Sequence, residues 1–137
     1  MKKKRLLALI LVFTLLLSLP AFATTDRSSE QIHRRDVRVT VLSGQIAVKA
    51  SVYGMGPMDK IGCQSIYVYK QVGSFWVLSD RLTEADAGMT STNVSGHMNT
   101  FYFDTTAGTE YKVIVTVFAE NDAGRDSRTD IFYVTGK

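Results

Sequence analysis

Residues 111–119 show the clearest alternation of apolar and other positions in the chain. One side of the pattern is apolar and consists of Tyr111, Val113, Val115, Val117 and Ala119. A period of two with many β-branched residues predicts a strand whose apolar side faces the core. Gly108 before this run and the Asn-Asp-Ala-Gly sequence at 121–124 after it are turn signals that bound the strand.

Shorter runs with the same character recur along the chain. They predict strands at residues 37–41, 46–52, 64–70, 75–79, 97–104 and 130–135. The first of these has charged residues between its valines, which is typical of an edge strand. Strands spaced about ten residues apart, with turn signals between them and no helical period, predict an all-β antiparallel sandwich or barrel.

Two segments favour loops over strands. Gly54 to Lys60 contains two glycines and a proline in seven residues, which is the strongest loop signal in the sequence. Arg81 to Gly96 is rich in Thr, Ser, Asp, Asn and Gly, so it is expected to be mostly loop, with room for one short strand. A brief helix at Thr83 to Ala87, with Thr83 as its N-cap, is the alternative for part of that segment.

The strand at residues 64–70 is apolar on both of its sides. Either Ile66 and Val68 or Tyr67 and Tyr69 face the core, and parity alone leaves both options open.

The N-terminus has the pattern of a cleaved export signal. Four basic residues, Lys2 to Arg5, precede an apolar run that ends at Pro20, and Ala21-Phe22-Ala23 supplies small residues for a signal peptidase. An uncleaved membrane anchor is the alternative, but a spanning helix needs roughly 20 consecutive apolar residues. The predicted organisation is therefore a signal peptide at 1–23, a flexible leader at 24–36 and a β-sandwich domain at 37–137, in a secreted, extracellular protein.

Removal of the predicted signal changes the charge of the chain. It takes away four of the sixteen Lys and Arg residues and none of the thirteen acidic ones, which leaves a net charge of −1. A nucleic-acid or anionic-membrane partner would require a clustered positive patch, so neither is expected. Arg34, Arg35 and Arg38 form the one local basic cluster and are interpreted as part of a solvated tail.

No catalytic, cofactor-binding or metal-binding residues are predicted. Cys63 is the only cysteine, so an internal disulfide is impossible, and an inert, packed thiol is expected. His33 and His97 stand in stretches that look like a tail and a loop, where neither would activate that thiol. The acids at residues 80–86 lack the order and the glycine of a calcium loop, and no glycine-rich turn leads into a helix that could hold a phosphate.

The segment from Ser65 to Thr135 resembles the second half of a fibronectin type III domain, a branch of the immunoglobulin-like sandwiches. An Ile-Tyr-Val-Tyr strand and a hairpin with a tryptophan precede Gly108-Thr109-Glu110-Tyr111, which leads into the alternating valines. The resemblance implies that Tyr111 is a corner tyrosine whose hydroxyl contacts upstream backbone near residues 104–107. The chain as a whole resembles the small, uncharacterised exported proteins of Gram-positive bacteria.

The outward side of the predicted sheet is the remaining candidate for function. Ile114 and Phe118 lie on it, and the neighbouring strands add aromatic residues that are common at binding hot spots. We expect a monomeric, non-enzymatic binding or adhesion module that recognises a protein or a glycan through Tyr67, Tyr69 and Trp76. The alternatives are a small secreted hydrolase and a passive structural or colonisation protein, and the segment at 81–96 is the candidate for a loop that covers this face.

Overall fold

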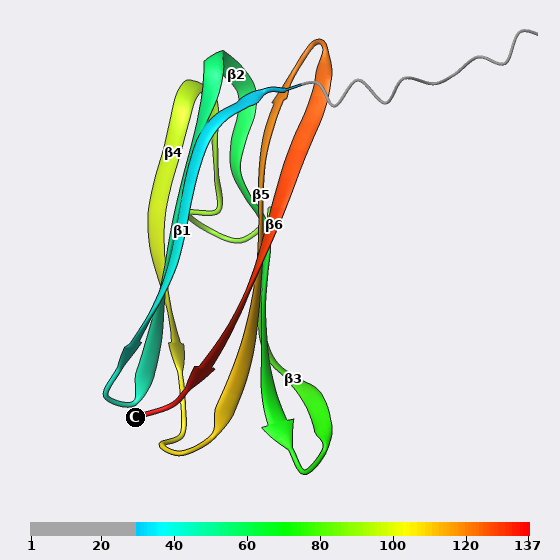
Figure 1. The fold of residues 1–137 in the computed structure, drawn as a ribbon. Coiled ribbons are helices and arrows are strands. Elements are labelled where there is room, and N and C mark those ends of the chain that lie inside the picture. Colours follow the sequence, from blue (N-terminus) through cyan, green and yellow to red (C-terminus); the bar gives the residue numbers. More distant parts are fainter. Residues whose placement is uncertain (1–29) are drawn as a thin grey trace, which may run out of the picture.

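The computed structural model describes residues 30–137, which contain six antiparallel strands and no helix (Figure 1). The strands are β1 (Ile32–Leu42), β2 (Gln45–Val72), β3 (Phe75–Thr83), β4 (Thr90–Asp104), β5 (Glu110–Asn121) and β6 (Gly124–Thr135). The predicted signal at 1–23 and the leader up to residue 29 lie outside this range. Between residues 30 and 137 the structure has no helix long and apolar enough to cross a membrane.

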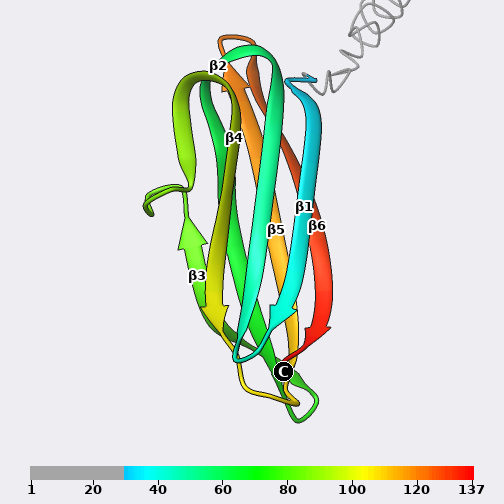
Figure 2. The same ribbon diagram turned by 90° about the vertical axis from the view of Figure 1, so that its left-hand side faces the viewer.

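The six strands form one antiparallel sheet that curls into a half-barrel (Figures 1 and 2). β2 is the longest strand and pairs with four others. Its first part, residues 45–53, lies between β1 and β4, and we call these strands the first wall. Its last part, residues 65–72, lies beside β3 and β5, and with β6 next to β5 these strands form the second wall.

The prediction of a loop from Gly54 to Lys60 is wrong, because β2 continues through this segment as a bent strand. The register with β4 shifts between Tyr53 and Met58, which marks the bend. Gly54 lies so close to Met58 that a Cβ at this position would be 2.6 Å from the Met58 Cε. The glycines and the proline therefore mark an irregular passage of one strand from the first wall to the second.

The start of the domain predicted at Val37 is also corrected. β1 begins at Ile32, and residues 34–36 pair with β2. The Ile32 amide donates a hydrogen bond to Asp126 Oδ2 at 3.2 Å. An edge strand keeps its outward side chains in solvent, so a polar stretch such as His33 to Asp36 resembles a tail in the sequence.

The predicted long loop at 81–96 reduces to the six residues between β3 and β4. β3 extends to Thr83 and β4 begins at Thr90, while the short helix predicted at 83–87 is absent. Asp86 Oδ2 instead accepts a hydrogen bond from the Thr83 amide at 2.7 Å and closes a turn. The side chains of β4 near residues 93–95 are exposed, which explains why this strand carries no apolar pattern at its start.

The core lies between the two walls. Its fully buried members include Ile46, Val48, Ile61, Cys63, Ile66, Val68, Met89, Val113, Val115, Val117 and Ala119. The predicted inward side of residues 111–119 is confirmed. The open question at residues 64–70 is also resolved, because Ile66 and Val68 are buried whereas Tyr67 and Tyr69 point outward. Each such aliphatic side chain contributes about 1.5–3 kcal/mol when it is fully buried.

Tyr111 connects the start of β5 to the turn before it. Its ring is buried, and its hydroxyl accepts a hydrogen bond from the Thr106 amide at 2.8 Å. Gly108 has a φ of 80°, which allows the chain to turn tightly between the two residues. The predicted contact of the Tyr111 hydroxyl with upstream backbone is confirmed.

Candidate functional site

The three residues predicted to bind a partner, Tyr67, Tyr69 and Trp76, lie on the outer side of the second wall. Strand register adds neighbours from β5 and β6, because Tyr67 stands opposite Ile114 and Tyr69 stands opposite Lys112. Residues directly opposite each other in antiparallel strands project to the same side of the sheet. We call the resulting surface the aromatic face, which consists of Tyr67, Tyr69, Trp76, Leu78, Lys112, Ile114, Ile131 and Tyr133.

The centre of the aromatic face is a cluster of rings around one ammonium group. Lys112 Nζ lies 4.9 Å from the centroid of the Tyr69 ring and 5.2 Å from that of Trp76. The Trp76 and Tyr133 centroids are 5.9 Å apart at an interplanar angle of 54°. Because β2 and β5 separate β3 from β6, Trp76 and Tyr133 reach toward each other across these strands. Cation–π attraction holds the lysine between the rings.

The aromatic face is open to solvent. Tyr133 is 67% exposed and Ile131 is 54% exposed, while Tyr67, Tyr69 and Trp76 are half-buried. Trp76 is therefore a surface residue with one side packed against its neighbours.

The segment expected to cover this face covers only one end of it. Phe118 projects outward from β5 but is fully buried, and the Arg125 guanidinium lies over its ring, 4.0 Å from the centroid. Arg125 also pairs with Glu84 in the β3–β4 connection, and Lys60 Nζ lies 2.9 Å from Glu84 Oε2. The hydrogen bond from Arg125 is the main cause that lowers the pKa of Glu84. These ion pairs close the Phe118 end and leave the rings free.

Sequence reasoning missed Lys112 and Tyr133 as members of the face. Both occupy outward positions in strands with an alternating pattern, and this alternation was the one sequence feature that could have placed them on the face. Their proximity to Trp76 depends on the register between β2, β5 and β6, and single-strand patterns do not contain that information.

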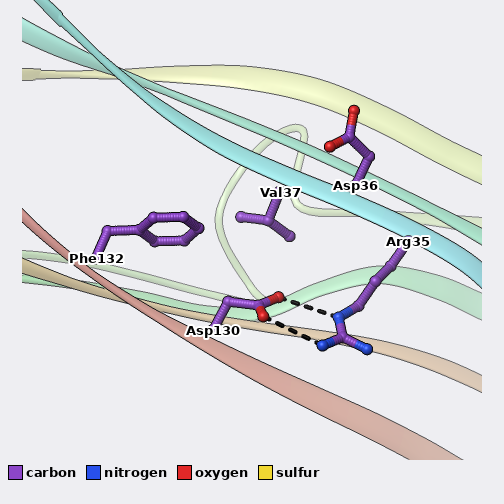
Figure 3. A pocket seen from close by; sticks show the side chains of 5 residues that line it. All are labelled: Arg35, Asp36, Val37, Asp130 and Phe132. Carbon is purple, nitrogen blue, oxygen red and sulfur yellow. Dashed lines mark hydrogen bonds and ion pairs between the residues drawn. The ribbon is translucent and has the colours of Figure 1, made fainter.

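A second surface feature, also missed, is a shallow slot between the edge strands β1 and β6. Its volume is about 430 Å³, and its lining residues are Arg35, Asp36, Val37, Asp130 and Phe132 (Figure 3). Arg35 Nε and Nη2 donate to the two carboxylate oxygens of Asp130 at 3.1 Å and 3.2 Å. This bidentate pair joins the two edges, and the Asp130 carboxylate raises the pKa of Arg35. The Arg35–Asp130 pair therefore links the two walls and has a structural role.

The groups considered for nucleophilic chemistry do not assemble into a catalytic arrangement. Cys63 is fully buried, and burial raises the pKa of its thiol to about 12, so the thiolate is not formed near neutral pH. Ser91 Oγ lies 2.8 Å from His97 Nδ1, but no carboxylate of residues 30–137 bonds to this imidazole. The same residues include no cluster of three or more His, Cys, Asp or Glu side chains suited to a metal ion.

No protein-family model matches the chain, and no curated protein matches it. Among solved structures, hypothetical protein PH1083 from Pyrococcus horikoshii OT3 is similar, with a TM-score of 0.43 and 16% identity over 74% of this chain and 89% of that one. Spo0M, a sporulation control protein from Bacillus subtilis, is similar with a TM-score of 0.44 and 12% identity. That match covers 76% of this chain and 49% of Spo0M. Likeness at this level carries no conclusion about activity.

Proposed function

We propose that the chain is an exported, non-enzymatic binding module. Its domain is an immunoglobulin-like β-sandwich of the fibronectin type III kind, and it binds a protein or a glycan at or outside the cell surface. The aromatic face is the binding surface.

Strand arrangement and one hydrogen bond support the fold assignment. The order β1, β2, β4 in the first wall and β3, β2, β5, β6 in the second is the order of a fibronectin type III domain when the two parts of β2 count as two strands. The bond from the Thr106 amide to the Tyr111 hydroxyl has the geometry of a tyrosine corner.

Exposure of the aromatic face is the observation that carries the binding assignment. Soluble monomeric domains rarely leave rings and aliphatic side chains clustered on an open surface unless that surface meets a partner. Here the cluster spans four strands of a rigid sheet, so its geometry is fixed before binding and little rotamer freedom is lost. The export assignment has support from the residue pattern at 1–23 alone.

Export is tested on residues 1–137, expressed in a bacterial host and recovered from the medium. Mass spectrometry of the recovered protein is expected to give Thr24 as the first residue. Retention in the membrane fraction with residue 1 or 2 at the N-terminus would contradict a cleaved signal.

Binding is tested with the secreted protein and fractions of cell wall and culture medium. Trp76 is the only tryptophan, so its fluorescence reports directly on the aromatic face. Tyr133→Ala is expected to lower the affinity at least tenfold, because Tyr133 packs on Trp76. Tyr102→Ala is the matched control, since Tyr102 is 60% exposed on the first wall. Equal loss in both variants, or turnover of a captured molecule, would overturn the proposal.

A further inference from the structure

Lys112 differs from the other cation on the outer surface of the second wall that has aromatic contact. Arg125 lies over Phe118 and is paired with Glu84 and Glu120, so its charge is balanced. Lys112 lies over Tyr69 and Trp76 and makes no ion pair with a carboxylate in the described part of the chain. The cation at the Phe118 end is therefore neutralised by ion pairs, whereas the ammonium group at the centre of the aromatic face has no carboxylate within ion-pair distance in the described part of the chain.

Within residues 30–137, the charges near Lys112 are of both signs, but none is paired with it. Glu110, two residues before Lys112 on the same side of β5, is exposed and forms no ion pair with it. Arg81, opposite Tyr67, adds a second positive charge at the β3 side. Glu84 and Glu120 lie beyond Phe118, where Arg125 holds both. A ligand on the aromatic face would meet the rings and the Lys112 ammonium group, with the exposed Glu110 as the neighbouring carboxylate.

The rings strengthen the attraction of Lys112 for an anion. Two aromatic neighbours exclude part of the water around the ammonium group, and a charge pair gains more energy as the local dielectric falls. An ammonium group has three N–H donors, and the ring contacts leave donor capacity for an incoming oxygen. Sugar rings complement such a surface, because the apolar C–H side of a pyranose packs on an aromatic ring while its hydroxyl groups remain hydrated.

We infer that the aromatic face binds an anionic saccharide, whose sugar rings pack on Trp76 and Tyr133 and whose carboxylate or phosphate contacts Lys112. This inference rests on the proposed function and names the ligand class of the same site. The charge complementarity at Lys112 favours this ligand over a neutral glycan, and the adjacent exposed rings favour it over a small inorganic anion.

Fluorescence titration of the secreted protein with defined probes tests the inference. The probes are pentamannose, phosphorylated pentamannose, pentagalacturonate and pentaglutamate. We expect at least one anionic saccharide to bind tenfold or more tightly than pentamannose and its affinity to fall as salt is raised. The probe that binds identifies the anion as a phosphate or a carboxylate.

Two lysine variants separate the charge from the packing. Lys112→Met keeps the apolar stem and removes the ammonium group, so it is expected to abolish the tenfold preference for the anionic saccharide over pentamannose. Lys49→Met is the control, because Lys49 is an exposed lysine on the first wall. A preference unchanged in Lys112→Met would overturn the inference.

Other outcomes distinguish failure of the inference from failure of the proposed function. The inference is overturned if pentaglutamate binds as tightly as the better anionic saccharide. It is also overturned if pentamannose binds as tightly as the two anionic saccharides. In either case the aromatic face remains a binding surface. If Tyr133→Ala captures the same molecules from cell-wall and medium fractions as the unaltered protein, the face is not a binding surface and both proposals fail.

Discussion

At the scale of single residues, the Tyr111 hydroxyl holds the turn before β5 through one bond to the Thr106 amide. Tyr111→Phe removes the acceptor and leaves a backbone donor without its partner, so we expect a loss of about 1–2 kcal/mol in the free energy of unfolding. Urea denaturation measures this change. Tyr102→Phe, at an exposed position, is expected to have no measurable effect, and equal stability of both variants would refute the corner contact.

We expect His97 to make the free energy of unfolding depend on pH. Burial lowers the pKa of its imidazole below the usual value of 6.5, although the nearby Gly88 carbonyl opposes the shift. Ser91 Oγ contacts Nδ1, and no acidic group of residues 30–137 pairs with the ring. The imidazole then binds a proton more readily in the unfolded chain than in the folded one. The contribution of neutral His97 to the free energy of unfolding is therefore complete above about pH 6.5 and is lost as the pH falls toward the folded-state pKa.

The measurement is the urea midpoint between pH 8 and pH 5. We expect it to decline below about pH 6.5 and the decline to be weaker in His97→Gln. His33→Gln is the control, because His33 is exposed on β1. If the decline disappears in His33→Gln and persists in His97→Gln, the pH dependence comes from His33 and the prediction is wrong.

At the scale of elements, Gly62 lies where β2 packs closely against Met89, the residue just before β4. Its φ is 149°, and a Cβ at this position would lie 2.2 Å from the Met89 carbonyl oxygen, which accepts the Cys63 amide hydrogen bond. Gly62→Ala is expected to cost about 2–4 kcal/mol, since the obstacle is backbone rather than a flexible side chain. Thermal denaturation checks this value.

Gly56→Ala is the matched control for that prediction, because a Cβ there meets no atom within 4 Å. It is expected to change the free energy of unfolding by less than about 1 kcal/mol. If the two substitutions were equally mild, the β2–β4 contact would be looser than its geometry indicates.

Local patterns predict strands where one side is buried. Residues 46–52 and 111–119 alternate because the core selects every second side chain. β1 before Val37 and the start of β4 fail this test, since their side chains are mostly exposed and pairing is through the backbone. Gly54 to Lys60 fails for a different reason: a glycine and proline signal is the same in a loop and in a bent strand.

The candidate site was predictable only in part for a related reason. Tyr67, Tyr69 and Trp76 belong to adjacent strands joined by a tight hairpin, so the turn at Gly73 sets their register and common side. Lys112 and Tyr133 reach the same cluster through pairings between segments far apart in the chain. Only the folded sheet brings these two residues to Trp76.

At the scale of the whole molecule, the two walls are parts of one sheet, because β2 belongs to both. The slot between β1 and β6 is fastened at both ends. The Gly44 amide donates to the Lys137 carbonyl at 2.8 Å, and the Ile32 amide donates to Asp126 at the other end. Because Cys63 forms no disulfide, these hydrogen bonds and the core hold the two walls together.

The direction of the edge strands has a mechanical consequence. β1 and β6 run the same way, so the start of β1 and the end of β6 lie at opposite ends of the half-barrel (Figure 1). A force applied between residues 30 and 137 therefore acts along both strands and loads the β1–β2 and β5–β6 ladders in shear, where many hydrogen bonds must break together. Attachment at residues 44 and 137, which lie at the same end, would peel the strands apart one bond at a time. Single-molecule pulling is expected to require a higher force in the first geometry than in the second.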